Sequence, residues 1–186
     1  MGFRPNRSTI DNIFMVRQIY EKCHEYNIDL HNIFVDFSQA FGTVNRDVIY
    51  NSLIKHNIPD KLIKLIKLTM QQTKMKVKVN NSYSEWFETK TGVRRGDPLS
   101  ALLFSVVLDS VITNLEVRRN ITTRLKQICA YADDTVITGR TTQALIDTFC
   151  KLKQEALNAG LIVNNNKAKY LYCTRKTIHP TYMDTG

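Results

Sequence analysis

The stretch Ala130-Tyr131-Ala132-Asp133-Asp134 places two carboxylates side by side between two apolar or strand-forming runs, 125–132 and 135–138. Neighbouring aspartates repel each other, so a chain that holds them together at the end of a hydrophobic strand usually needs a cation there. We interpret the stretch as a strand, a two-aspartate turn and a returning strand. The predicted cation is Mg²⁺.

The composition of the 186 residues limits the class of protein. Hydrophobic residues make up 43% and charged residues 23%, which is typical of one folded domain. The net charge of +9 favours a partner that carries phosphates, with a solvated basic surface as the plainer alternative. The four cysteines lack metal-ligand spacing, and no apolar run is long enough to span a membrane. We therefore expect reduced cysteines and an intracellular chain without a membrane partner.

Hydrophobic periodicity predicts both helices and strands along the chain. The expected helices are 8–26, 46–56, 60–72, 99–115 and 141–158, the last of them ended by Gly160. The expected strands are 28–37, 74–79, 83–89, the two flanks of the aspartate turn, and 161–173. The fold class is therefore α/β (α+β), with an antiparallel sheet backed by helices.

A third carboxylate, Asp36, lies at the end of the predicted strand 28–37. A sheet can bring it close to Asp133 and Asp134. In-line displacement by two metal ions about 3.5–4 Å apart needs such a set of hard oxygen ligands. The corresponding reaction is phosphoryl or nucleotidyl transfer. The alternative for any single aspartate at a strand end is a turn residue or a helix cap.

Lys74, Lys76 and Lys78 alternate with apolar residues, and the runs 74–79 and 83–89 predict a hairpin around Asn80-Asn81-Ser82. The three lysines share one face of that hairpin. They either protect an edge strand from aggregation or contact a nucleic-acid backbone.

Three ordered motifs resemble the consecutive palm motifs of reverse transcriptases. They are Phe34-Val35-Asp36-Phe37-Ser38-Gln39-Ala40-Phe41, Gly92-Val93-Arg94-Arg95-Gly96-Asp97-Pro98-Leu99-Ser100 and Tyr131-Ala132-Asp133-Asp134. Residues 2–8 resemble the fingers-to-palm motif of non-LTR retrotransposon (LINE-type) and group II intron enzymes. Residues 159–169, which include Lys167, resemble the motif that follows the aspartate pair. The resemblance extends from about Gly2 to Cys173.

The resemblance implies an RNA-directed DNA polymerase of a retrotransposon. Such an enzyme adds deoxynucleotides, taken from deoxynucleoside triphosphates, to a primer 3′-hydroxyl on an RNA or DNA template. Asp36, Asp133 and Asp134 would be catalytic. They would bind two ions of Mg²⁺ or Mn²⁺, with the main-chain carbonyl of Phe37 as a further ligand.

The resemblance also implies contacts with the nucleotide. Phe41 would exclude a ribose 2′-hydroxyl, with a core aromatic as the equal alternative. Arg95 and Gly96 would lie against the incoming nucleotide. Lys167 would stabilise the leaving pyrophosphate, with an ordinary surface lysine as its alternative.

The expected contacts with template and primer come from Arg4 and Arg7 together with Lys74, Lys76 and Lys78. We expect residues 1–178 to form a palm with the end of the fingers, followed by an irregular tail, 179–186. Most of the fingers and the thumb are expected to be missing.

Two positions depart from the family pattern: Gly42 replaces an aspartate, and Arg95 replaces a glutamine. Neither position is a proposed metal ligand. However, Gly42 loses a side chain that could fix the local geometry, and Arg95 alters a nucleotide contact. The alternative function is therefore an inactive remnant that only binds nucleic acid.

Overall fold

The structure is a computed structural model, and it describes residues 8–115, 127–131, 134–174 and 178–179. The helices are α1 (Thr9–Glu25), α2 (Ala40–Thr43), α3 (Arg46–Lys55), α4 (Asp60–Met70), α5 (Pro98–Asn114) and α6 (Thr142–Asn158). The strands are β1 (Leu30–Val35), β2 (Phe37–Ser38), β3 (Lys74–Met75), β4 (Lys78–Val79), β5 (Ser82–Tyr83), β6 (Phe87–Glu88), β7 (Gln127–Tyr131), β8 (Asp134–Gly139), β9 (Ile162–Val163), β10 (Lys169–Cys173) and β11 (Ile178–His179).

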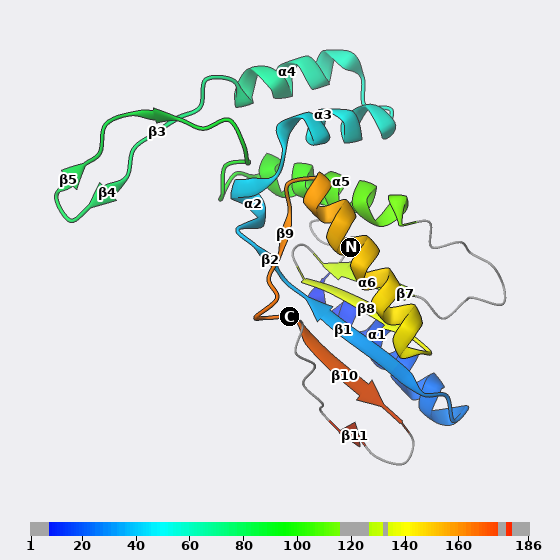
Figure 1. The fold of residues 1–186 in the computed structure, drawn as a ribbon. Coiled ribbons are helices and arrows are strands. Elements are labelled where there is room, and N and C mark those ends of the chain that lie inside the picture. The colour runs from blue at the N-terminus through cyan, green and yellow to red at the C-terminus, as the bar shows by residue number, and fades with distance from the viewer. Residues whose placement is uncertain (1–7, 116–126, 132–133, 175–177, 180–186) are drawn as a thin grey trace.

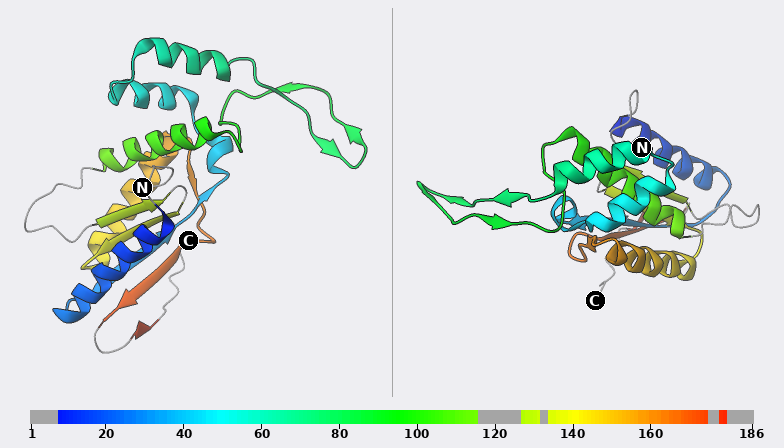
Figure 2. Two further views of the ribbon diagram at one scale, coloured as in Figure 1. Left: turned by 180° about the vertical axis from the view of Figure 1, so that it is seen from behind. Right: turned by 90° about the horizontal axis from the view of Figure 1, so that it is seen from above.

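The central element is a five-stranded antiparallel sheet with the strand order β11-β10-β1-β8-β7. Helix α6 packs on one face, against β1 and β8, while α1 lies on the opposite face (Figures 1 and 2). Helix α5 contacts α6 and α3, and α4 packs on α3 farther from the sheet. The predicted antiparallel sheet backed by helices is confirmed.

The main core lies between the sheet and the α5 and α6 helices. Ile33 and Val35 of β1 and Ile137 of β8 are buried on that side, because alternate residues of a strand face the same way. From the helices, Phe104 and Leu152 are completely buried against them. This core fixes the position of the strand ends at which the carboxylates lie.

Local sequence signals set the helix ends. The Asp97 side chain accepts a hydrogen bond from the Leu99 N–H at 2.9 Å, and Pro98 occupies the first turn of α5. After α6, Gly160 adopts φ +79, and a Cβ there would lie 2.6 Å from the Thr43 carbonyl oxygen. The predicted end of this helix at Gly160 is confirmed.

Two expected strands are interrupted. The run 28–37 breaks at Asp36, between β1 and β2, so the prediction of one strand that ends on this carboxylate was only approximate. The run 161–173 is divided into β9 and β10 by a turn at 165–167. The second prediction was wrong because Asn164-Asn165-Asn166 favours a turn: the Lys167 and Ala168 N–H groups both donate to the Asn164 carbonyl oxygen.

The predicted lysine-rich hairpin is confirmed, and we call its residues 74–88 the arm. Its strand pairs β3–β6 and β4–β5 form small sheets separate from the central one. The arm projects away from the body of the molecule (Figures 1 and 2).

Near the C-terminus, His179 of β11 pairs with Tyr172 of β10. Residues 180–186 lie outside the described part of the chain. The boundary at 178/179 therefore stays a prediction. Among the described helices, none combines the length and apolar character needed to cross a membrane.

Candidate active site

Asp36 and Asp134 leave the central sheet at the same end of neighbouring strands. Val35 of β1 pairs with Thr135 of β8, so the residue after Val35 and the residue before Thr135 are adjacent positions of this antiparallel pair. The hairpin between β7 and β8 closes with Tyr131 opposite Asp134. The predicted approach of these two carboxylates is therefore supported by strand register.

Asp133 directly precedes Asp134 in the sequence and lies outside the described residues. Arg4 and Arg7 also lie outside them. The roles expected for these three residues stay predictions.

Two residues that are distant in sequence contact Asp36. The Lys167 Nζ lies 3.2 Å from Asp36 Oδ2, and the Asn164 Nδ2 donates to the same oxygen at 3.5 Å. The Asn164 main-chain N–H also donates to the Asp36 carbonyl oxygen at 2.8 Å. The Asp36 side chain is 23% exposed, while that of Lys167 is 67% exposed. The lysine is therefore able to leave the carboxylate at little cost.

The donor chemistry of this strand end fits a divalent hard cation. Carboxylate oxygens are preferred ligands of Mg²⁺, and Asp36 and Asp134 supply them from two adjacent strands. Phe37 is buried, and because a phenyl ring has no donor atom, only its main-chain carbonyl could bind a metal. Among the described residues, the Lys167 ammonium supplies the positive charge that balances Asp36. A metal ion would compete with this ammonium for the Asp36 carboxylate.

Phe41 packs into the core beside this strand end. Its ring centroid lies 5.1 Å from that of Phe104, and its carbonyl oxygen accepts the Val93 N–H at 2.6 Å. The ring is partly buried. Phe41 therefore packs as a core aromatic, which was the alternative role expected for it. The exclusion of a ribose 2′-hydroxyl by this ring stays a prediction.

The glycine-rich loop 92–100 is attached to the backbone near Phe41. Gly92 adopts φ +77, its N–H donates to the Val44 carbonyl at 2.9 Å, and a Cβ on it would lie 2.5 Å from the Gly42 carbonyl oxygen. Only glycine fits this close approach. Farther along, Arg95 and Gly96 are exposed, and nothing lies within 4 Å of a Cβ built on Gly96. The structure therefore leaves both free of steric obstruction on the loop surface.

Arg46 holds the same loop from the side, and sequence reasoning did not identify it. Its Nε donates to the Gly92 carbonyl at 3.0 Å, Nη1 to the Met70 carbonyl at 2.7 Å and Nη2 to the Thr91 carbonyl at 3.3 Å. A cation in the first position of α3 is unfavourable for the helix dipole. That mismatch was the available signal that Arg46 has a tertiary role.

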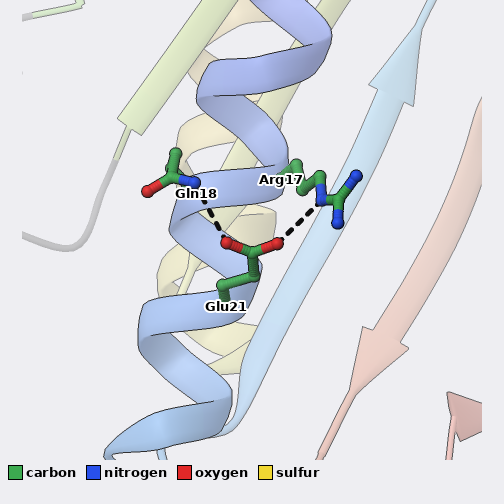
Figure 3. Close-up of polar contacts among 3 residues, drawn as sticks. All are labelled: Arg17, Gln18 and Glu21. Atoms are coloured by element: carbon green, nitrogen blue, oxygen red, sulfur yellow. Dashed lines mark hydrogen bonds and ion pairs between the residues drawn. The ribbon is translucent and has the colours of Figure 1, made fainter.

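A cavity of about 570 Å³ lies between α1 and the sheet, with Asp134 among its lining residues. Its cationic side chain, Arg17, pairs through Nε with a Glu21 carboxylate oxygen at 2.7 Å, and Gln18 donates to the other oxygen at 3.0 Å (Figure 3). Among the described lining residues, Arg17 is the only lysine or arginine. The described lining of this cavity thus presents one cationic side chain, and Lys167 is not part of it.

The chain is similar to known proteins in both sequence and fold. The family model described as Reverse transcriptase (RNA-dependent DNA polymerase) matches residues 1–181. The chain is 26% identical over 168 residues to the Retrovirus-related Pol polyprotein from type-2 retrotransposable element R2DM of Drosophila melanogaster, covering 89% of this chain and 16% of that protein. It is 26% identical over 150 residues to the Transposon TX1 uncharacterized 149 kDa protein of Xenopus laevis, covering 77% of this chain and 11% of that one.

The fold resembles that of telomerase. The solved telomerase from Candida albicans, in complex with a TWJ fragment of telomeric RNA, matches with a TM-score of 0.73 and 12% sequence identity over 97% of this chain and 32% of that one. Such low identity shows the fold alone. The chain thus spans a small part of each of these proteins. The sequence resemblance to non-LTR elements is confirmed, and this chain belongs to the reverse transcriptase (RNA-dependent DNA polymerase) family.

Proposed function

We propose that this chain carries the palm active site of a retrotransposon RNA-directed DNA polymerase. The observation that carries the proposal is the convergence of Asp36 and Asp134 at one end of paired strands, with Lys167 Nζ 3.2 Å from Asp36. The substrates would be deoxynucleoside triphosphates and a primer annealed to an RNA or DNA template.

The proposed metal ligands are Asp36, Asp133 and Asp134, together with the Phe37 carbonyl. When bound, two Mg²⁺ or Mn²⁺ ions would lower the pKa of the primer 3′-hydroxyl and stabilise the leaving pyrophosphate. The protein's own part is to hold the carboxylates in a fixed arrangement. Burial of Val35 and Phe37, on either side of Asp36, provides that rigidity.

Lys167 would change partner during the reaction. Its ammonium is mostly exposed and is bound to Asp36 through one oxygen. If metal ions were bound by the carboxylate, the Lys167 ammonium would be available to donate hydrogen bonds to the pyrophosphate oxygens, where negative charge develops. The Phe41 ring would limit space beside the sugar 2′-position, and Arg95 and Gly96 would contact the nucleotide from the loop.

Primer extension on an RNA template tests this function. The chain is incubated with Mg²⁺ or Mn²⁺ and compared with Asp36→Asn and Asp133→Asn. Incorporation by the unmodified chain that falls at least a hundredfold in both variants supports the proposal, because removing a metal-binding carboxylate removes charge stabilisation in the transition state. Equal incorporation by all three proteins, or none by any, would contradict it.

The alternative function is an inactive remnant that binds nucleic acid, and Gly42 is the observation that favours it. The family usually has an aspartate there, and a Cβ at Gly42 would meet nothing within 4 Å. Gly42→Asp can therefore be made without steric conflict. Incorporation that appears only in Gly42→Asp would show that the natural chain is inactive.

A further inference from the structure

The arm exposes large aromatic side chains at its end. Trp86 is 61% exposed and Tyr83 is 62% exposed, both on short strands or between them. Exposed aromatic rings on a segment that projects from the body carry no packing role in the core. They are therefore accessible for contact with another molecule.

The register of the arm places these rings on the same face as its lysines. Met75 pairs with Phe87. The Ser84 N–H donates to the Val77 carbonyl oxygen, and the Val77 N–H donates to the Ser84 side-chain Oγ, both at 2.9 Å. Two residues, Glu85 and Trp86, therefore lie opposite the single residue Lys76. This is a β-bulge. Nearer the tip, Lys78 pairs with Tyr83. The extra residue brings Trp86 and Tyr83, three positions apart, to one face.

The contacts between these side chains agree with that face. The Lys76 Nζ lies 4.3 Å from the Trp86 ring centroid and 5.7 Å from the Tyr83 ring centroid. The Lys78 Nζ lies 5.6 Å from the Tyr83 ring. Lys76 thus bridges the two rings by cation–π contacts and holds them in place. The resulting surface combines Lys76 and Lys78 with the two rings, while Lys74, nearer the body, pairs with Glu88.

We propose that this face of the arm binds single-stranded nucleic acid, with bases stacked on Trp86 and Tyr83 and phosphates at Lys74 and Lys78. The arm has three lysines against two glutamates, and the whole chain has a net charge of +9, so the charge favours a polyanion. Rings stack on unpaired bases, since the bases of a duplex already stack on each other. The identification of the bound nucleic acid as the template rests on the proposed function, whereas the binding of a single strand does not.

The chain has a single tryptophan, Trp86, so its fluorescence reports on the arm alone. Titration with a 12-nucleotide single strand of mixed sequence should quench this emission, because a stacked base quenches an indole. The 12-base-pair duplex of the same sequence, at equal phosphate concentration, should quench much less. Single strands of RNA and of DNA are titrated separately to identify the preferred backbone.

Variants separate stacking from general charge. Binding of a fluorescein-labelled single strand, followed by anisotropy, should weaken on the order of tenfold in Trp86→Leu and be largely retained in Trp86→Phe. Lys74→Met together with Lys78→Met should reduce the salt dependence of binding instead. Tyr26→Leu is the matched control, since Tyr26 is 66% exposed with Lys22 Nζ 5.9 Å from its ring, away from the arm. Far-ultraviolet circular dichroism melts confirm that each variant is folded.

The inference is overturned if single strands bind without quenching Trp86, if they do not bind at all, or if Trp86→Leu binds as tightly as the unmodified chain. It is also overturned if vesicles of phosphatidylserine and phosphatidylcholine shift the Trp86 emission while single strands do not. Quenching without primer extension would leave the arm binding intact and remove only the polymerase function. Primer extension without quenching of Trp86 would support the polymerase function and overturn the binding of single strands by the arm.

Discussion

The strand end around Asp36 and the arm around Trp86 are held in place in opposite ways. At Asp36, the neighbours Val35 and Phe37 are 2% and 4% exposed, and contacts come from Asn164 and Lys167, more than a hundred positions later in the chain. In the arm, Trp86 is 61% exposed, and its contacts come from the facing strand of the same hairpin.

The two regions correspond to two different requirements of a templated polymerase. Metal-binding carboxylates need positions fixed to a fraction of an ångström, which a buried sheet provides. A surface that accepts any base sequence needs only exposed rings and charges on a segment that can adapt. The two regions should therefore respond differently to substitution, and four changes test that expectation in order of their effect on stability.

Gly92→Ala should have the largest effect. Its Cβ would lie 2.5–2.8 Å from the Gly42 backbone, and φ is +77, so we expect a loss on the order of 3 kcal/mol in unfolding free energy. Gly42→Ala is the matched control from the other side of the same contact, since its Cβ would meet nothing within 4 Å. Chemical denaturation of both variants checks the pair. An equal loss in both would show that the close approach is not a constraint.

Arg46→Met should rank second, with a loss of about 2 kcal/mol. The substitution leaves the carbonyl oxygens of Gly92, Met70 and Thr91 without their charged donor. Limited proteolysis should then cut within 91–97 sooner than in the unmodified chain. Arg94→Met removes one hydrogen bond of 3.4 Å from an exposed side chain and should leave both measurements almost unchanged. Similar cleavage rates in the two variants would contradict a positioning role for Arg46.

Asp36→Asn should change stability by less than about 1 kcal/mol, because its ion-pair partner Lys167 is 67% exposed. Its effect should appear with Mg²⁺ instead. Added MgCl₂ stabilises a protein that binds the ion only when folded, so the melting temperature of the unmodified chain should rise. Asp36→Asn should lose that rise, while Asp147→Asn, an exposed α6 carboxylate, should keep it. The same response in all three proteins would argue against metal binding at Asp36.

Local patterns predicted much of the fold and part of the site. The capped helices, the lysine-rich hairpin and the strands that flank Asp36 and Asp134 follow from periodicity and turn residues. A role for Lys167 at the site came only from the resemblance, and its ion pair with Asp36 was not predicted, because no local pattern links positions so far apart. Arg46 was missed because most of its partners are main-chain carbonyls, which leave no pattern in the sequence, so its place at the start of α3 was the one local signal. The bulge that brings Tyr83 and Trp86 together depends on cross-strand register, which alternation alone does not specify.

Removal of the arm should have the smallest effect on stability. The Thr89 N–H donates to the Thr73 carbonyl at 2.9 Å, so the two ends of the arm already meet where it leaves the body. Replacing residues 74–88 with Asn-Gly closes this gap with a two-residue turn and removes little buried apolar surface, since every residue from Lys74 to Glu88 is exposed. We expect a melting temperature within a few degrees of the unmodified chain and an unchanged response to Mg²⁺, with single-strand binding strongly reduced. Unfolding on removal of the arm would show that the arm supports the palm, and the contrast between the two regions would then fail.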